Sequence, residues 1–293
     1  MVGPAAKRVA VGWLVDARET SLRRACRVLR LSTATWRYQR RDRIDNGQLL
    51  ARLQAHAAAR ARYGYRRLHT LIAREGLVVN HKRVHRVYRE AGLQVPRRRR
   101  RRITRGARLP LPRAGAPRER WSMDFMADTL ADGRGFRLLN IVDDCTRQCL
   151  AIEVDRSLPG LRVVRVLERL RDTIGVPRVI VVDNGPEFVG RTVEAWAHTH
   201  QVELRFIRPG KPMENAYVES FNGKFRDECL NEHWFLSVAE AQQVVEAWRV
   251  DYNTVRPHRS LGQQTPAAYA AALSTSGALT NVTQTPESET AER

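Results

Sequence analysis

A short run of β-branched residues, Val179–Val182 in the sequence RVIVVDNG, constrains the fold of this chain most strongly. Every position of the run is apolar, and Asp183 and the turn-forming pair Asn184-Gly185 follow it directly. Such a pattern predicts a buried strand of an α/β sheet that ends at Asp183. Ligands of α/β folds collect at the carboxyl edge of the sheet, so this strand would deliver a carboxylate to that edge.

Two further acidic residues have an equally specific setting. Asp124 alternates with apolar neighbours in WSMDF, which predicts a first strand. Glu219 follows Asp183 with 35 residues between them and lies in AYVESFNGKF, where the apolar residues have helical spacing. A single acidic residue is most often a surface residue. Carboxylates from three separate segments, however, can together supply the oxygen ligands that divalent cations prefer, which predicts metal-dependent polynucleotidyl transfer.

From about residue 110 to residue 270 the chain resembles the retroviral-integrase-like catalytic domain of DDE transposases. The motifs that carry the resemblance are WSMDF, VDNGPEF, GKPMENAYVESFNGKFRDECL and YNTVRPHRSLGQQTPAAY, and they are most similar to the second-frame protein of IS-three-type bacterial insertion elements. The resemblance implies that Asp124, Asp183 and Glu219 are the catalytic, metal-binding triad. Two Mg²⁺ ions are the expected cofactor, with Mn²⁺ as a substitute.

The same resemblance places a basic residue near the donor end of the DNA at Arg226, seven residues after Glu219. Seven residues are about two helical turns, so Arg226 should share the face of Glu219. Lys224 is a second expected DNA contact on this helix.

The elements of this part follow in the order strand, strand, strand, helix, strand, helix, strand, helix. FRLLNIVDDCTR and QCLAIEVD continue the first strand as an antiparallel meander. The predicted fold is an α/β ribonuclease-H-like core, with a mixed five-stranded sheet and flanking helices, preceded by all-helical helix-turn-helix-type modules. Asp143 and Asp144 are rival carboxylates that we expect to shape a turn instead, and Cys145 and Cys149 are expected in the core.

Charge is distributed unevenly along the chain. Residues 1–122 hold 32 Lys and Arg against 7 Asp and Glu, a formal charge of +25, whereas residues 123–293 hold 19 against 24, a formal charge of −5. The basic part therefore predicts a surface that binds the phosphates of DNA. No long basic amphipathic helix with aromatic anchors favours a membrane instead.

Residues 1–45 predict a helix-turn-helix-like DNA-binding module. Apolar positions recur with helical spacing on both sides of a break at Leu31-Ser32, and Ser21 and Ser32 are candidate N-caps. The second helix would direct Thr33, Thr35 and Arg37 toward a groove. A plain helical hairpin with a basic surface is the alternative.

Residues 46–95 predict a second small helical module. One helix should present Leu68, Leu71 and Ile72 and end at Gly76, and the next should begin at the cap Asn80 and present Val84, Val87 and Tyr88. Lys82, Arg83 and Arg86 mostly avoid that apolar stripe and are expected to contact DNA. His81 and His85 could share a metal ion, but no CxxC lies nearby, and a solvated or DNA-facing pair is favoured.

Residues 96–118 predict an extended linker, because the six arginines Arg97, Arg98, Arg99, Arg100, Arg101 and Arg102 repel one another and prolines and glycines follow. We expect it to track DNA, with a solubilising tether as the alternative. The catalytic domain would then span residues 119–273. The Thr-, Ser- and Glu-rich residues 274–293 predict a disordered tail.

The expected function is that of a transposase that binds the terminal inverted repeats of an insertion element and catalyses strand cleavage and transfer into target DNA. A binding-only regulator would have no reason to retain three carboxylates, and a ribonuclease-H-like nuclease would not need the basic helices. Tyr217 suggests a tyrosine recombinase, yet no Arg-His-Arg set surrounds it. His258 is either a DNA contact or a structural cap.

The partners that these features imply are double-stranded DNA and further copies of the chain on that DNA. IS-three-type elements usually add a short upstream-frame protein, and both a fusion with it and independent action stay open. No apolar run approaches the roughly 18 residues of a membrane span, and no signal-peptide core begins the chain. With four scattered cysteines, these features predict a cytoplasmic, nucleoid-associated bacterial protein.

Overall fold

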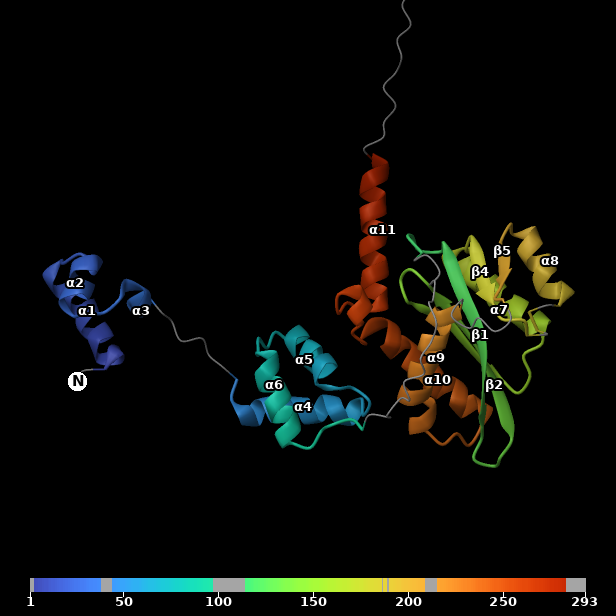
Figure 1. Ribbon diagram of the computed structural model, residues 1–293, viewed down its shortest axis with the longest axis horizontal. Helices are drawn as coiled ribbons and strands as arrows, with labels where there is room; N and C mark the ends of the chain where they lie inside the picture. Colours follow the sequence, from blue (N-terminus) through green and yellow to red (C-terminus); the bar gives the residue numbers. More distant parts are fainter. Residues whose placement is uncertain are drawn as a thin grey trace, which may run out of the picture. The chain divides into compact units, whose positions relative to one another are not determined.

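The computed structural model describes residues 3–37, 44–96, 114–185, 187–188, 190–208 and 215–282, the last seven of these as backbone only (Figure 1). The chain divides into two compact units, residues 1–46 and residues 47–293. The six arginines of the predicted linker lie outside the described residues.

The described residues of the first unit form three helices, α1 (Pro4–Arg18), α2 (Leu22–Val28) and α3 (Thr33–Arg37). Its core is formed by the predicted apolar positions, with Val11, Ala25 and Cys26 fully buried. The Oγ atom of Ser32 accepts a hydrogen bond from the amide of Thr35 at 3.1 Å, which confirms this N-cap. Ser21 occupies the N-cap position of α2, but its side chain makes no capping hydrogen bond.

The second unit begins with α4 (Asn46–Ala59), α5 (Tyr65–Arg74) and α6 (His81–Glu90). Both predicted stripes are confirmed, because the apolar residues of α5 and α6 named above are all buried. Gly76 follows α5 with a φ of +84°, a conformation that glycine adopts without strain. Asn80 caps α6 by accepting a hydrogen bond from the amide of Lys82 at 2.8 Å.

A mixed five-stranded sheet in the order β3-β2-β1-β4-β5 forms the rest of the unit, which confirms the predicted fold class. β2 lies antiparallel between β1 and β3, and β4 lies parallel between β1 and β5. The strands are β1 (Arg120–Thr129), β2 (Gly135–Asp143), β3 (Cys149–Asp155), β4 (Val179–Val182) and β5 (Glu203–Phe206).

Helices cover both faces of the sheet, so each face has its own hydrophobic core (Figure 1). On one face Met123 and Ile180 pack against α7 (Gly160–Ile174) and α8 (Arg191–Thr199). On the other face Met126 and Leu138 pack against α9 (Ala216–Glu228) and α10 (Val238–Thr254). Successive residues of a strand face opposite sides, so the alternation in β1 places Asp124 on the α9 side.

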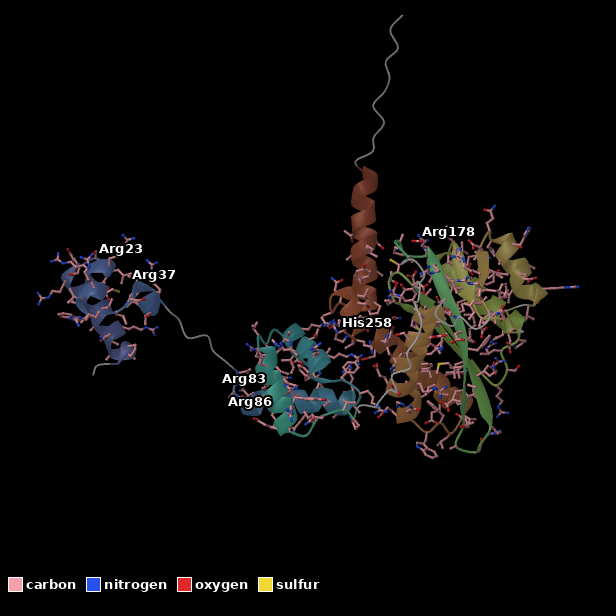
Figure 2. The ribbon with its side chains drawn as sticks, viewed as in Figure 1. Arg23, Arg37, Arg83, Arg86, Arg178 and His258 are labelled. Atoms are coloured by element: carbon pink, nitrogen blue, oxygen red, sulfur yellow. The ribbon has the colours of Figure 1, made fainter. Side chains whose placement is uncertain are left out.

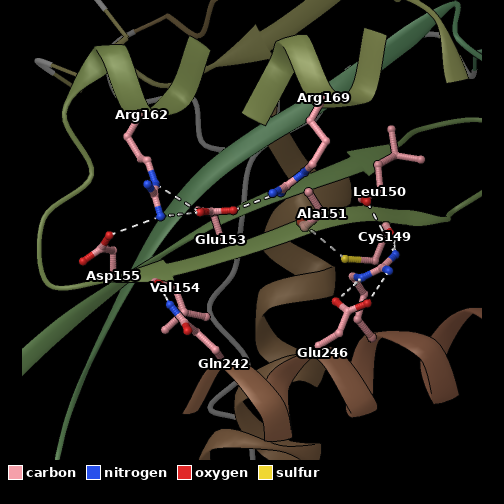
Figure 3. Close-up of polar contacts among 11 residues, drawn as sticks. Cys149, Leu150, Ala151, Glu153, Val154, Asp155, Arg162, Arg169, Gln242 and Glu246 are labelled. Atoms are coloured by element: carbon pink, nitrogen blue, oxygen red, sulfur yellow. Dashed lines mark hydrogen bonds and ion pairs between the residues drawn. The ribbon is translucent and has the colours of Figure 1, made fainter. Parts of the chain in front are cut away.

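Side chains of α10 donate hydrogen bonds to backbone carbonyl groups of the edge strand β3 (Figure 3). Gln242 donates to the carbonyl of Val154 at 2.8 Å, and Arg249 donates to the carbonyl of Cys149 at 3.1 Å. These contacts take up carbonyl groups that an open edge would offer to another chain, which disfavours aggregation by strand pairing.

The C-terminal part differs from the sequence prediction. Helix α11 (Pro266–Val282) continues beyond Ser274, where the disordered tail was predicted to begin. The prediction is therefore wrong for residues 274–282, which are helical although the stretch STSGALTNV holds one alanine and mostly weaker helix formers. Residues 283–293 lie outside the described part of the chain. Among the helices that the structure describes, none is long and apolar enough to cross a membrane.

Candidate active site

Two of the three predicted carboxylates lie at the same edge of the sheet. β1 pairs with β4 from Arg120 to Ser122, and Asp124 follows two residues later. Asp183 directly follows the last residue of β4. Because the two strands are parallel neighbours, both carboxylates emerge where β4 ends. Glu219 lies in the first turn of α9, the helix that covers this face of β1 and β2.

The three carboxylates interact electrostatically. Burial, followed by the negative charges of Asp183 and Glu219, raises the pKa of Asp124 to about 6, although hydrogen bonds from the Phe125 amide and the Asn222 side chain act in the opposite direction. Negative charge that is concentrated in one site favours binding of a cation. Carboxylate oxygens are the ligands that Mg²⁺ prefers, so the donor set fits this ion.

In the described residues, the side chains of the three carboxylates do not converge closely enough to hold one metal ion together. Within the described parts of the chain, no three His, Cys, Asp or Glu side chains lie close enough to hold one metal ion. The side chain of Glu219 is largely exposed, and those of Asp124 and Asp183 are half-buried. Like charges repel, which favours separated rotamers for such side chains.

An asparagine pair orients Asp124. Asn222 lies one turn after Glu219 and donates from Nδ2 to Oδ2 of Asp124 at 2.7 Å. Asn140, which is fully buried and pairs in register with Asp124, donates in turn to Oδ1 of Asn222 at 2.7 Å. Neither residue was predicted from the sequence. The spacing of Asn222 after Glu219 is a signal that could have identified it, whereas nothing local marks Asn140.

The turn after β4 has the predicted form. Oδ1 of Asp183 accepts a hydrogen bond from the amide of Gly185 at 3.0 Å, and Asn184 donates to the carbonyl of Ile207 at 3.0 Å. A Cβ atom at Gly185 would lie 2.9 Å from Oδ1 of Asp183, so a larger residue would displace the carboxylate. Nearby, Glu187 is paired with Arg137, which lowers the pKa of Glu187.

Helix α9 directs its two predicted DNA contacts to different sides. Arg226 donates to the carbonyl of Ala127 in β1 at 3.0 Å, so it lies on the same side as Glu219, as predicted. Lys224 lies about 140° around the helix from Glu219. Its Nζ atom donates to Oγ of Ser220 at 3.1 Å, and burial followed by the charge of Arg256 lowers its pKa to about 8.

Apart from the six arginines at 97–102, which lie outside the described residues, the remaining predicted DNA contacts lie on the N-terminal helices, where Figure 2 labels Arg37, Arg83 and Arg86. Thr33, Thr35 and Arg37 belong to α3, where Arg37 is exposed and the carbonyl of Thr35 accepts a hydrogen bond from Nε of Arg8 at 2.8 Å. On α6, Lys82 and Arg86 are exposed and Arg83 is partly exposed.

The structure shows which partners the rival carboxylates Asp143 and Asp144 bind. Asp143 shapes a turn as predicted, because its Oδ1 accepts the amides of Cys145 and Thr146. Asp144 lies in the same turn, and its buried side chain accepts hydrogen bonds from Nε of Arg120 at 2.5 Å and from Oγ of Ser122 at 2.7 Å.

His258 is a structural residue. It is 5% exposed, its ring packs on Tyr252, and its carbonyl accepts the amides of Leu261 and Gln263. Burial and then the charge of Arg256 lower its pKa to about 2, so the imidazole is neutral at physiological pH.

The raised pKa of Asp124 predicts a stability effect in the absence of metal. The folded pKa, about 6, exceeds the ordinary value of 3.8 for an aspartate, so this group favours folding at low pH and becomes destabilising as pH rises from about 4 to 6. We expect Asp124→Asn to stabilise the metal-free protein at pH 7.5 by about 1–3 kcal/mol. Thermal unfolding in EDTA measures this change. A lower melting temperature for the variant would contradict the electrostatic account.

Comparisons with known proteins agree on the two parts of the second unit. Family models described as "Integrase core domain" match residues 114–212 and 200–266, and one described as "HTH-like domain" matches residues 44–101. The helix-turn-helix match therefore lies on α4–α6, whereas the assignment of such a motif to residues 1–45 stays a prediction.

Similar proteins come from insertion elements. The chain is 49% identical over 251 residues to the "Insertion element IS407 uncharacterized 31.7 kDa protein" of Burkholderia multivorans, which covers 86% of this chain and 91% of that protein. It is 44% identical over 270 residues to the "Insertion element IS476 uncharacterized 39.2 kDa protein" of Xanthomonas euvesicatoria, covering 92% of this chain and 78% of that protein.

A solved structure, the simian T-cell lymphotropic virus intasome in complex with the PP2A regulatory subunit B56 gamma, contains a chain of similar fold. The TM-score is 0.50 at 14% sequence identity, and the match covers 74% of this chain and 73% of that one. At this identity the likeness concerns the fold alone.

Proposed function

Because this chain belongs to the IS-three-type family of insertion-element transposases, whose catalytic part is an integrase core domain, we propose that it is a DDE-type polynucleotidyl transferase. Asp124, Asp183 and Glu219 would be its catalytic carboxylates. They would bind two Mg²⁺ ions, which Mn²⁺ could replace. When bound, the ions supply Lewis-acid stabilisation of the charge that develops on oxygen during displacement at phosphorus.

The observation that supports this proposal best is the electrostatic coupling of the three carboxylates across one edge of the sheet. Two of them come from parallel strands and the third from the helix above, so no single local motif produces the cluster. The asparagine pair holds the Asp124 carboxylate in one orientation, and the Asp183 carboxylate is held by the turn at Gly185. Preorganised ligands lower the cost of binding a cation.

The basic helices would hold the DNA. On α6, Lys82, Arg83 and Arg86 present positive charge on the module that matches an HTH-like model. Thr33, Thr35 and Arg37 of the first unit, together with the arginines at 97–102, would add a second contact region. Terminal inverted repeats and target DNA are the proposed substrates, and assembly of several copies on them is the proposed active form.

An assay on a labelled DNA end separates the proposed function from its alternatives. A transposase should cleave the end of its element in Mg²⁺ and then join the resulting 3′ end to a second DNA, and EDTA should abolish both steps. Cleavage without joining would favour a nuclease of ribonuclease-H type. Specific binding without either reaction would favour a regulator.

A further inference from the structure

Four arginines of the α4–α5 segment contact the helices that follow the sheet instead of facing solvent. Arg60 pairs with Asp251 of α10, and Arg62 pairs with Glu232 at 2.9 Å. Arg74 donates to the carbonyls of Val255 and Gln263 at 2.6 and 2.9 Å. The fourth arginine, Arg67, reaches α9. This side of the helical module therefore binds the catalytic part, while the basic residues of α6 lie elsewhere on the module.

Glu228, the last residue of α9, is the buried carboxylate of this contact. Its Oε1 atom accepts from Nη1 of Arg67 at 2.9 Å and from Nη2 of Arg256 at 2.6 Å, and its Oε2 atom accepts from Nε of Arg256 at 2.7 Å. The side chains of Glu228 and Arg256 are 8% and 3% exposed. Burial alone would raise the pKa of Glu228, but the hydrogen bonds and charges of Arg256 and Arg67 outweigh it and lower the pKa.

Such a buried carboxylate does not tolerate the loss of a partner easily. An ion pair in the interior is stabilising only while its geometry is kept, since a charge that loses its partner there remains desolvated. Movement of Arg67 would therefore weaken its ion pair with Glu228. The guanidinium of Arg67 is itself held over the buried ring of Tyr63, at 5.0 Å from the ring centroid.

Glu228 and Glu219 belong to the same continuous helix. α9 runs from Ala216 to Glu228 with no proline, so a displacement at its C-terminal end is transmitted along its axis. Along the helix, Asn222 and Arg226 attach the opposite side to Asp124 and to the backbone of β1. The position of Glu219 above the sheet thus depends on two attachments, one to β1 and one to Arg67 and Arg256.

We propose that Glu228 is a positioning residue for the active site, and that Arg67 of the helical module holds α9, and with it Glu219, at the position where Glu219 can join the other two carboxylates on a metal ion. The proposal rests on the proposed function of the carboxylates. It links the module that matches an HTH-like model to the catalytic helix through one named ion pair.

The test compares Arg67→Gln with Arg66→Gln in the full-length chain. The two arginines are neighbours on α5, and each change removes one positive charge. Arg66 is exposed, and among the contacts of the described residues its side chain touches only its neighbour Tyr65, through the hydroxyl and the ring. An effect of net charge alone should therefore appear in both variants. Arg67→Gln alone should disturb α9.

For Arg67→Gln we expect strand transfer at saturating DNA to fall roughly 10- to 100-fold, because small misplacements of catalytic groups have effects of this size. The Mg²⁺ concentration for half-maximal activity should rise several-fold, which loss of a purely structural contact far from the site would not cause. Amide hydrogen exchange of residues 216–228 should accelerate in Arg67→Gln and stay unchanged in Arg66→Gln.

Together with Arg67→Gln, the Glu228→Gln variant and the Arg67→Gln/Glu228→Gln double variant form a double-mutant cycle that measures the coupling of the two residues. If the two residues act through their contact, the double variant should be little worse than Glu228→Gln alone. Glu228→Asp, which keeps the charge, should recover part of the lost Mg²⁺ affinity.

An unchanged Mg²⁺ dependence of Arg67→Gln, or α9 exchange equal to that of Arg66→Gln, would overturn the proposal. Additive effects in the double variant would do the same. Failure of the proposed function is a separate result: it would appear as activity that survives loss of the triad carboxylates, whereas hydrogen exchange would still report on the contact of Arg67 with α9.

Discussion

Replacing any one of the three catalytic carboxylates by its amide, as in Asp124→Asn, Asp183→Asn or Glu219→Gln, is expected to lower strand cleavage and joining by roughly 10³-fold or more. A ligating carboxylate contributes several kcal/mol to the stabilisation of the transition state through the metal ion, and each 1.36 kcal/mol is tenfold in rate. DNA binding should change little, because the basic surface of residues 1–122 is untouched. Single-turnover cleavage and joining on a labelled DNA end measure the loss.

Asp128→Asn is a matched control for this experiment. Asp128 lies four residues after Asp124 on the same strand, is half-exposed and bonds only to the neighbouring amide of Thr129 among its described hydrogen bonds. Its replacement should leave activity within a factor of about two. Substantial strand transfer by one of the three amide variants would remove that residue from the site, and equal losses in Asp128→Asn would indicate a general effect of charge.

Changing Arg97–102 to serine is expected to weaken binding to all DNA sequences and to flatten its salt dependence. If each arginine neutralises one phosphate, the slope of log K against log salt should decrease in magnitude by up to about 5. Affinity at low salt should fall by roughly two orders of magnitude or more. Terminal-repeat and random DNA should be affected alike, because phosphate contacts carry little base information. Titrations at several salt concentrations measure both quantities.

The control replaces the same six arginines by lysine, which keeps the charge but removes the bidentate guanidinium geometry. Its salt slope should stay near that of the unchanged chain. A serine variant with an unchanged slope would assign the segment to the tether alternative, and a selective loss of repeat binding would mean that the arginines read bases.

Local features of the chain were predicted from the sequence because they depend on neighbouring residues. The apolar run before Asp183, the stripes of α5 and α6, the positive φ of Gly76 and the cap at Asn80 all follow from the periodicity and backbone preferences of short segments. The antiparallel meander of β1, β2 and β3 and the mixed five-stranded sheet also agree with the prediction, whereas the parallel pairing of β1 with β4 was not predicted and is seen only in the structure.

Contacts between distant segments were decided only by the tertiary structure. Asn140 and Asn222 are 82 residues apart, and Arg67 and Glu228 are 161 residues apart, so no local pattern marks either pair. Asp143 and Asp144 have the same sequence context, yet one shapes a turn while the other binds Arg120 in the interior. The sequence by itself thus determined which segments form strands and helices and which carboxylates end at the sheet edge. The packing of α9 between β1 and Arg67 determined which polar groups orient those carboxylates, because a buried polar side chain takes whichever partner the folded chain brings within hydrogen-bonding distance.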